Sequence, residues 1–193
     1  AWGVQIVFDN QVILGTRARK TRTKSFNAFS SIDYPETAMF RDRRLIQFLQ
    51  RPAEYTHAVF STALDPNVFV LRLVPGMRAD IIPLLEGRYR ALVLESFGVG
   101  GLPGGDDGAM FAAVRDWCGA GHLAVFTTQV PHEGSDLAVY EVGRAAKALP
   151  GVLEAHDMTP EATAVKLMWV LGQTTDRAEA EKLFLTPVQW DIL

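Results

Sequence analysis

A short apolar run that breaks into a glycine-rich loop limits most strongly what this chain can fold into. The residues from Ala91 to Leu94 are all apolar, which is typical of a strand buried on both faces, as in a parallel sheet. Gly98, Gly100 and Gly101 follow; they allow positive φ and let a ligand or another backbone approach closely. In an open α/β sheet, ligands bind beyond the carboxyl ends of the strands, where this loop lies. Two interpretations remain open, a ligand site or a loop that only packs.

The order of the expected elements in the second part of the chain indicates an α/β fold. Strand-like runs alternate with helix-like runs at close spacing, which predicts a parallel, doubly wound sheet with helices packed against it. The expected strands cover residues 68–73, 91–94 and 124–127, with a short strand or turn at 151–154. The expected helices cover residues 80–86, 109–118, 138–149, 160–171 and 178–185.

Residues that favour helix ends support three of these helices. Asp80 and Asp106 are candidate N-caps of the first two. The helix expected over residues 160–171 has the clearest signals. Asp157 or Thr159 is its candidate N-cap, it starts with a proline, and it is expected to end at Gly172. We interpret the helix at residues 160–171 as a packing helix that carries no catalytic or binding residue.

The first part of the chain is predicted to be a β-hairpin followed by a basic segment. Two β-rich runs, 3–8 and 11–15, flank Asp9-Asn10, which favours a tight turn. Residues 26–62 show no regular period and are expected to form an irregular connector. Between the hairpin and this connector lies the basic segment. Its composition alone favours an exposed basic face, but it leaves open a phosphate-binding patch or a catalytic lysine. The basic residues are Arg17, Arg19, Lys20, Arg22 and Lys24.

Charge and composition argue against several function classes. The net charge is -3 and the sequence pI is near 5.8, so we predict binding to neither nucleic acid nor a membrane. No apolar run approaches the roughly 18–20 residues that span a bilayer, and no signal peptide is visible. Cys118 is the only cysteine, so nothing suggests an oxidising compartment, and we predict a cytoplasmic protein. The histidines, at positions 57, 122, 132 and 156, lack metal-ligand spacing, so no metal or other cofactor is expected.

Four motifs, in this order along the chain, resemble those of one known family. They are GTRARKT with FNAFSS in residues 15–31, LVLESFGVGGLP at 92–103, VFTTQ at 125–129 and DMTPEATAVKL at 157–167. Together they are similar to the motifs of bacterial-type L-asparaginases, and their details resemble the cytoplasmic, type I-like members more than the periplasmic ones. The resemblance covers nearly the whole chain.

The resemblance implies that the sequence holds only part of the family's architecture. Members carry an N-terminal domain with a nucleophilic threonine in a Gly-Gly-Thr context and a second threonine followed by aspartate, and no such pair precedes Lys20 here. We therefore expect residues 1–31 to be the terminal hairpin and basic segment of that otherwise absent domain, and residues 32–62 to be a connector. Residues 63–193 are expected to form a three-layer α/β C-terminal domain with a small parallel sheet flanked by helices. This fragment alone is predicted to be inactive without the N-terminal domain.

The resemblance also implies a reaction, the hydrolysis of asparagine to aspartate and ammonia. A threonine hydroxyl attacks the amide carbon and water resolves the acyl-enzyme, so the hydroxyl needs a base or a cation beside it. In the family, a lysine at the end of this hairpin pairs with the second threonine and its aspartate, and Lys20 matches that position. Burial and neighbouring groups shift the pKa of a lysine readily, which suits the role. The remaining basic residues are then expected to be ordinary exposed charge: Arg17, Arg19, Arg22 and Lys24.

The C-terminal domain of family members closes the active site of a neighbouring subunit, which implies a homo-oligomer, either a dimer or a tetramer. Many members have an asparagine near the substrate at the position of Gly101, which has no side chain to replace it. Glu133 falls in the loop where some members offer a carboxylate to the substrate amine. Gly101 and Glu133 are therefore the predicted substrate-facing residues.

Two other functions remain open at this point. One is a stand-alone binding or interaction module without activity, because the nucleophile is absent from this sequence. The other is the asparaginase-like subunit of a tRNA-dependent amidotransferase, which shares the fold but needs an RNA-facing surface that this acidic chain does not suggest. The preference for asparagine over glutamine also stays open, because most of the substrate pocket belongs to the absent half.

Overall fold

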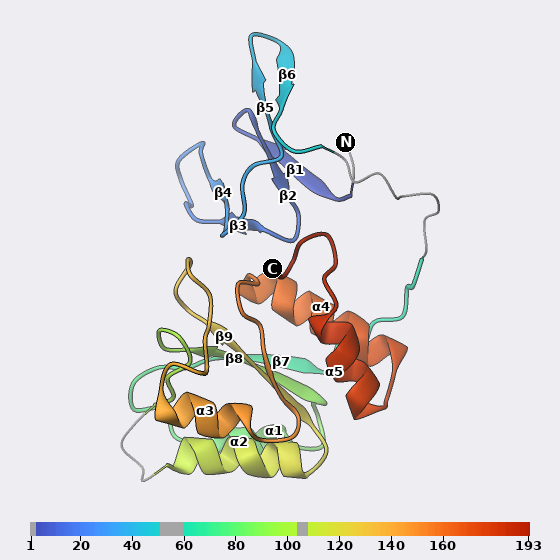
Figure 1. Cartoon of the computed structure of the whole chain (residues 1–193). Coiled ribbons are helices and arrows are strands. Elements are labelled where there is room, and N and C mark those ends of the chain that lie inside the picture. Colours follow the sequence, from blue (N-terminus) through green and yellow to red (C-terminus); the bar gives the residue numbers. More distant parts are fainter. Residues whose placement is uncertain (1–2, 51–59, 104–107) are drawn as a thin grey trace.

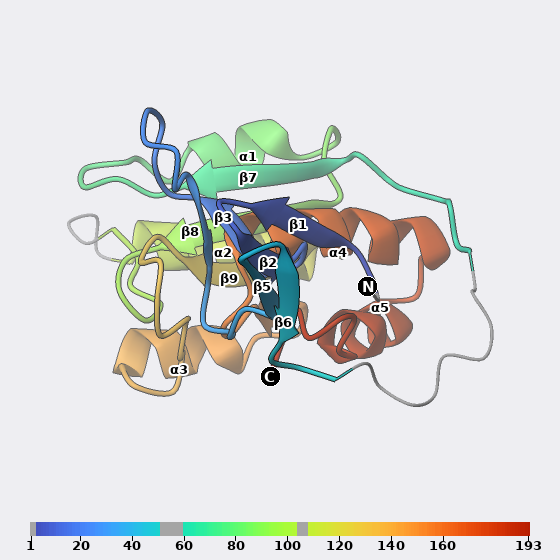
Figure 2. The same cartoon turned by 90° about the horizontal axis from the view of Figure 1, so that it is seen from above.

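The computed structural model describes residues 3–50, 60–103 and 108–193. A small N-terminal unit of antiparallel strands lies above a larger C-terminal α/β unit (Figure 1). Seen from above, the N-terminal strands lie over the C-terminal unit (Figure 2). No helix in the described ranges is both long and apolar enough to cross a membrane.

The N-terminal unit contains a four-stranded antiparallel sheet, in the order β1-β2-β5-β6, and a separate two-stranded sheet of β3 and β4. The predicted hairpin is present as β1–β2, and its turn places Asp9 and Asn10 at φ 48° and 62°. These two residue types tolerate the left-handed region better than other non-glycine residues. The strands are β1 Gln5–Phe8, β2 Gln11–Leu14, β3 Ala18–Lys20, β4 Phe29–Ser31, β5 Ala38–Arg41 and β6 Arg44–Gln47.

Strands β4, β5 and β6 lie in the segment expected to be irregular, so that expectation is wrong for residues 29–31 and 38–47. Strands β5 and β6 pair antiparallel around a turn at Asp42 and Arg43, both of which have positive φ. Each strand has four residues, and all four residues of β6 are exposed, so no buried–exposed alternation marks it. The turn also holds arginine where glycine is the usual hairpin signal. The sequence pattern therefore hides this hairpin.

The C-terminal unit is a parallel sheet with helices on both faces, which confirms the predicted α/β class. In the spatial order β10-β9-β8-β7, its strands are β7 Val68–Arg72, β8 Ala91–Ser96, β9 Leu123–Thr128 and β10 Val152–Glu154. Its helices are α1 Ile81–Leu85, α2 Ala109–Gly119, α3 Glu141–Lys147, α4 Pro160–Gln173 and α5 Arg177–Leu185.

The strand order corrects the predicted topology. Neighbouring strands follow one another in chain order, so the strand order does not reverse within the sheet as it does in a doubly wound fold. Helices α1, α2 and α3 each connect two successive strands and pack on one face, whereas α4 and α5 follow the last strand and cover the other (Figure 1). The sheet therefore lacks the switch point at which ligands usually bind in doubly wound sheets.

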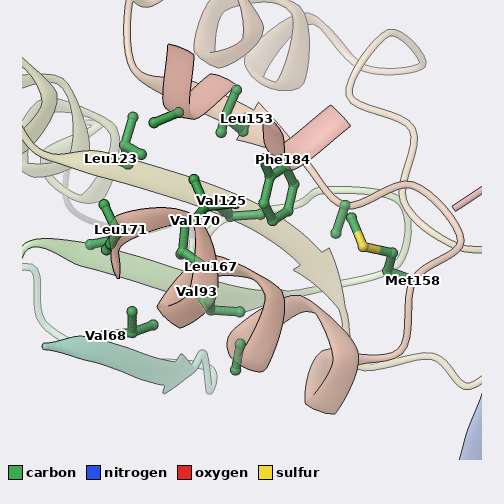
Figure 3. Close-up of a cluster of buried hydrophobic side chains, with 14 of the residues drawn as sticks. Val68, Val93, Leu123, Val125, Leu153, Met158, Leu167, Val170, Leu171 and Phe184 are labelled. Carbon is green, nitrogen blue, oxygen red and sulfur yellow. The ribbon is translucent and has the colours of Figure 1, made fainter. Parts of the chain in front are cut away.

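Alternating side chains of the central strands divide the core into two clusters. On one face, Val93 and Val125 pack with Leu167 of α4 and Phe184 of α5 (Figure 3). On the other face, Leu94 packs in the cluster that includes α1, α2 and α3. All six residues of β8 are buried, as expected for a strand covered on both faces.

The structure confirms one predicted cap and changes the role of one glycine. Thr159 is the N-cap of α4, and its side chain accepts a hydrogen bond from the Ala162 N–H at 3.1 Å. Gly172 does not end this helix, which runs on to Gln173. A Cβ at Gly172 would lie 2.4 Å from the carbonyl oxygen of Ala63. This glycine therefore allows a close approach between the helix and a neighbouring segment.

The caps expected for the two earlier helices differ from the prediction. Asp80 stands at the N-cap of α1, but its side chain makes no capping hydrogen bond. Asp106, the expected cap of α2, lies outside the described residues, and the helix begins after Gly108. Helix α3 is shorter at both ends than the predicted 138–149.

Candidate functional site

Lys20, the predicted catalytic lysine, closes strand β3 in the N-terminal unit. The strand pairs antiparallel with β4, and Lys20 lies opposite Phe29. Just beyond it, the Thr21 N–H donates a hydrogen bond to the Ala28 carbonyl oxygen at 2.8 Å, which continues the pairing past the strand end. The Lys20 side chain is exposed. Its backbone is thus held in place while its amine remains accessible to another domain or chain.

Arg17 is fully buried, so the prediction that it is ordinary exposed charge is wrong. Its guanidinium lies 2.8 Å from the carboxylate of Asp157. It also donates hydrogen bonds to the backbone carbonyl oxygens of Asp157, at 3.0 Å, and of Trp190. Its terminal carbon lies 5.4 Å from the centroid of the Tyr34 ring. A run of basic residues does not reveal which one turns inward, because these partners lie 140 and 173 positions further along the chain.

The other basic residues of this segment are closer to the prediction. Arg22 and Lys24 are exposed. Arg19 is half-buried, and its guanidinium lies 3.3 Å from the carboxylate of Glu161 in the first turn of α4. The segment therefore joins the two units through two ion pairs, a buried one at Arg17 and a more exposed one at Arg19.

The glycine loop after β8 is a tight turn. The N–H of Gly101 donates a hydrogen bond to the carbonyl oxygen of Phe97 at 2.7 Å, and the Phe97 N–H returns one at 2.9 Å. Gly98 and Gly100 have φ of 51° and 146°, and a Cβ at Gly100 would lie 2.5 Å from Leu137. The glycines are therefore needed for the turn and for close packing. Gly101 offers only backbone atoms to a substrate.

Glu133 lies in the loop after β9, next to the glycine loop. The Asp136 N–H donates a hydrogen bond to the Val99 carbonyl oxygen at 2.8 Å, and this bond ties the two loops together. Glu133 has φ 76° and an exposed side chain. The structure thus brings the predicted Gly101 and Glu133 to adjacent loops at the carboxyl edge of the parallel sheet, while Lys20 lies in the N-terminal unit.

Asp33 holds the Glu133 loop from the N-terminal unit, a contact that was not predicted. One carboxylate oxygen of Asp33 accepts a hydrogen bond from the Glu133 N–H at 3.0 Å. The other lies 3.0 Å from Nδ1 of His132. Figure 1 shows this loop rising from the sheet toward β3 and β4. The two residues are 100 positions apart, and no local pattern in the sequence marks them as partners.

An apolar groove of about 620 Å³ lies between the β1–β2 hairpin and helix α4. Two of its apolar residues are strongly exposed, Val4 at 77% and Val165 at 59%. Contiguous exposed apolar surface of this kind is typical of interaction sites. The groove is lined mainly by Val4, Ile6, Leu64, Val165, Trp169 and Val188, with Glu161, Lys166 and Asp191 as its charged residues.

Lys166 and Asp191 form a buried ion pair at this groove. The amine of Lys166 lies 2.9 Å from the Asp191 carboxylate and donates a hydrogen bond to the Thr186 carbonyl oxygen at 2.8 Å. Burial lowers the pKa of Lys166, and the hydrogen bond and charge of Asp191 oppose that shift. The pair links α4 to the C-terminal tail. Because the two side chains are paired with each other, we interpret this ion pair as structural.

Among the residues that the structure describes, no three or more His, Cys, Asp or Glu side chains gather in a way that could hold a metal ion. His57, one of the four histidines, lies outside the described residues. The arrangement therefore offers a lysine at a strand end and two loops at a sheet edge.

Comparison with known families gives two matches that follow one another along the chain. The model described as "Glutaminase/Asparaginase C-terminal domain" matches residues 67–184. The model described as "Asparaginase, N-terminal" matches residues 1–54. The predicted boundaries at residues 31 and 62 remain predictions.

Individual relatives agree with these matches. The L-asparaginase of Thermococcus kodakarensis is 38% identical over 182 residues, which are 94% of this chain and 54% of that protein. A glutamyl-tRNA(Gln) amidotransferase subunit of Metallosphaera sedula is 33% identical over 178 residues, which are 89% of this chain and 39% of that protein. The chain thus spans about half or less of these relatives.

Solved structures show the same relationship. The thermostable L-asparaginase from Thermococcus kodakarensis superposes with a TM-score of 0.92 at 35% identity, over 99% of this chain and 57% of that one. L-asparaginase I from Vibrio cholerae gives a TM-score of 0.84 at 25% identity, over 98% and 57% of the two chains. The predicted resemblance is confirmed, and because the C-terminal model matches more than half of its residues, this chain belongs to the glutaminase/asparaginase family.

Proposed function

We propose that this chain is the C-terminal half of an L-asparaginase, which hydrolyses asparagine to aspartate and ammonia together with an N-terminal half. The observation that supports this most is the 38% identity to the Thermococcus kodakarensis L-asparaginase over 94% of the chain. That relative is nearly twice as long, so it holds further sequence outside the matched region, and the proposal assigns that sequence to the larger part of an N-terminal domain.

In this proposal Lys20 assists a threonine of the N-terminal half. An uncharged threonine hydroxyl is a weak nucleophile, and a lysine that acts through the second threonine and its aspartate raises its reactivity. The exposed amine of Lys20, on a strand end with a fixed backbone, supports this role. Association with the N-terminal half would remove the amine from water and place it beside the aspartate of that half.

The N-terminal half is proposed to cover the apolar groove and the free edge of β1. Strand β1 is the outer strand of its sheet, and the exposed Val4 extends from it into the groove. An outer strand presents N–H and C=O groups to a further strand, and an exposed apolar face favours burial. Both features support a partner that continues the sheet.

Gly101 and Glu133 are proposed to face the substrate of a neighbouring subunit in a homodimer or homotetramer. The position of Glu133 on a loop at the sheet edge, with an exposed carboxylate and an anchored backbone, supports a contact to the substrate amine. Gly101 contributes backbone shape, because its loop is closed on itself and against Leu137. A cytoplasmic location remains part of this proposal.

Ammonia release from asparagine tests the proposed function. The segment of the Thermococcus kodakarensis L-asparaginase that precedes its match to this chain is fused in front of the chain, and the hybrid is compared with the chain alone and with the complete relative. We expect the chain alone to be inactive and the hybrid to turn over asparagine. Turnover by the chain alone would contradict the proposal that the N-terminal half is required for activity. A folded, assembled hybrid without turnover would contradict the asparaginase proposal.

A second function is favoured by one finding, the 33% identity to a glutamyl-tRNA(Gln) amidotransferase subunit over 89% of the chain. In that case amide hydrolysis by the hybrid should depend on glutamyl-tRNA(Gln). Turnover of free asparagine that is unchanged by adding this RNA supports the asparaginase proposal, whereas stimulation by it favours the amidotransferase. Failure of the chain to bind either substrate, with or without the N-terminal segment, would indicate an interaction module without activity.

A further inference from the structure

We propose that Arg17 is a positioning residue, which fixes the strand that carries Lys20 by anchoring it to the C-terminal unit. The inference rests on the proposed function for the role of Lys20. The anchoring itself follows from contacts that do not depend on any activity.

The hydrogen bonds and the ion pair of the Arg17 side chain reach into the C-terminal unit, and the side chain also lies over the Tyr34 ring. The guanidinium lies 2.8 Å from the Asp157 carboxylate. It donates hydrogen bonds to the backbone carbonyl oxygens of Asp157 and Trp190. The side chain is 0% exposed. A buried charge without partners is costly, so the fold keeps Arg17 in this orientation only when the two units are correctly docked.

The backbone of Arg17 starts the short sheet in which Lys20 lies. The Ile32 N–H donates a hydrogen bond to the Arg17 carbonyl oxygen at 2.9 Å. From there the pairing continues through Ala18 opposite Ser31 to Lys20 opposite Phe29. A two-stranded sheet of three residues per strand has little stability of its own. Fixing the Arg17 end therefore sets where the Lys20 end points.

Arginine is better suited to this role than other long side chains. Its planar guanidinium holds its donors in a fixed geometry, and here Nε and Nη1 donate hydrogen bonds to two carbonyl oxygens while Nη1 also lies 2.8 Å from a carboxylate oxygen. A lysine presents a single charged point and cannot reach these acceptors in the same geometry. A methionine would fill the space without directing the strand. Arg17→Lys is therefore the informative variant, because it keeps the charge and loses this fixed geometry.

A second ion pair in the same region provides a matched control. Arg19 and Glu161 also join β3 to the start of α4, but Glu161 is 59% exposed. Exposed ion pairs contribute little, because water screens the charges and two long side chains must be ordered. Glu161→Gln removes this pair and leaves Arg17 and Lys20 untouched. If the buried pair positions the strand, Arg17→Lys should change amide exchange and kcat much more than Glu161→Gln does.

Hydrogen exchange of the chain itself tests the anchoring. We expect Arg17→Lys to speed exchange of the backbone amides of residues 18–31 at least tenfold, while those of β8 and β9 in the C-terminal sheet keep their protection. Glu161→Gln should leave both regions unchanged. Protection of residues 18–31 that is the same in Arg17→Lys and the unmodified chain would overturn the inference, whatever the activity.

Kinetics of the hybrid enzyme test the consequence for Lys20. A displacement of about 1 Å of a catalytic group can lower the rate about 100-fold, so we expect Arg17→Lys to lower kcat by about that factor with KM within about threefold. The pH optimum of kcat should also shift, because Lys20 meets its partners in altered geometry. Thermal unfolding checks that the variant is folded at the assay temperature. An active hybrid in which Arg17→Lys keeps kcat and the pH profile would overturn the inference.

The two proposals fail in different ways. A folded hybrid with unmodified Arg17 and no turnover contradicts the asparaginase proposal, and the exchange experiment then decides alone whether Arg17 holds the Lys20 strand. Should Arg17→Lys not fold, Asp157→Asn removes the charge partner and retains the Asp157 backbone acceptor, so it serves in both measurements with the same expected direction.

Discussion

The buried guanidinium of Arg17 and the carboxylate of Asp157 lie 2.8 Å apart although 140 positions separate the two residues in the chain. Asp157 stands just before α4, and its other carboxylate oxygen accepts a hydrogen bond from the Leu193 N–H at 3.1 Å. One residue thus joins the N-terminal unit, the C-terminal helix layer and the end of the chain.

Removing one partner of this ion pair should be strongly destabilising. Arg17→Met leaves the Asp157 charge without its partner, which typically costs about 3–5 kcal/mol for a buried pair. The double variant Arg17→Met/Asp157→Asn should lose clearly less than the sum of the two single losses, because the second change no longer leaves a lone charge. Urea unfolding monitored by circular dichroism measures all three. The matched control Arg19→Gln should stay within about 0.5 kcal/mol, and additive losses in the cycle would contradict the coupling.

Lys20 should matter for turnover and not for folding. In the hybrid enzyme, Lys20→Ala is expected to lower kcat about 100- to 10,000-fold, the usual effect of losing a proton-transfer group. In the chain alone, the same substitution should leave the melting temperature unchanged, because the side chain is exposed there. The control is Lys24→Ala, an exposed lysine four positions on, which should retain full activity. Equal activities of the two variants would remove Lys20 from the site.

A side chain at Gly134 should disturb the loop that carries Glu133. Gly134 has φ +67°, and a Cβ there would lie 2.5 Å from the carbonyl oxygen of His156. Gly76 has a similar φ of +77° with nothing within 4 Å of the added Cβ. Gly76→Ala should therefore cost only the conformational penalty, about 1 kcal/mol, and Gly134→Ala should cost more. Thermal unfolding compares them, and equal losses would show that the contact with His156 relaxes freely.

The cap of α4 should contribute measurable stability. Thr159→Ala removes the acceptor for the Ala162 N–H, and such a loss typically costs about 1 kcal/mol. Asp80 occupies the equivalent position of α1 without a capping hydrogen bond, so Asp80→Ala should change little. Chemical denaturation of the two variants measures the difference. A cost for Asp80→Ala as large as that for Thr159→Ala would mean that the α1 cap forms in solution.

Cys118 should stay unreactive in the folded chain and affect stability only at high pH. Burial raises the pKa of its thiol to about 11, and nearby Arg177 opposes that shift. The folded state therefore keeps its proton between the ordinary value of 9.0 and about 11, whereas the unfolded state loses it. Stability from this group is fully present below pH 9.0 and declines as the pH rises toward about 11.

Two measurements check this expectation. A thiol reagent at about pH 8 should label Cys118 only when the chain is unfolded, since the thiolate is the reactive form. Cys118→Ala should show a smaller loss of stability than the unmodified chain on going from about pH 9 to about pH 10.5. Rapid labelling of the folded chain, or an identical alkaline profile for the variant, would contradict the buried thiol.

Features that depend on neighbouring residues could be predicted from the amino-acid sequence. The apolar run from Ala91, the cap at Thr159 and the Asp9-Asn10 turn each act within a few residues, so local pattern predicted the parallel strand, the start of α4 and the first hairpin. The motifs along the chain were also sufficient to identify the family. The order of the strands was not local information, and the doubly wound prediction failed on it.

Which charged side chains are buried and which loops are in contact became apparent from the folded chain alone. Arg17 and Arg19 are indistinguishable in a basic run, yet one is fully buried and the other pairs near the surface. Asp33 reaches the Glu133 loop across 100 positions. A buried ion pair is stable only when distant segments supply its partners in the right geometry, and a sequence pattern read over short windows contains no such distances. For the glycine loop after the strand that starts at Ala91, the close packing of Gly100 against Leu137 favours the interpretation of a loop that packs and carries no catalytic side chain.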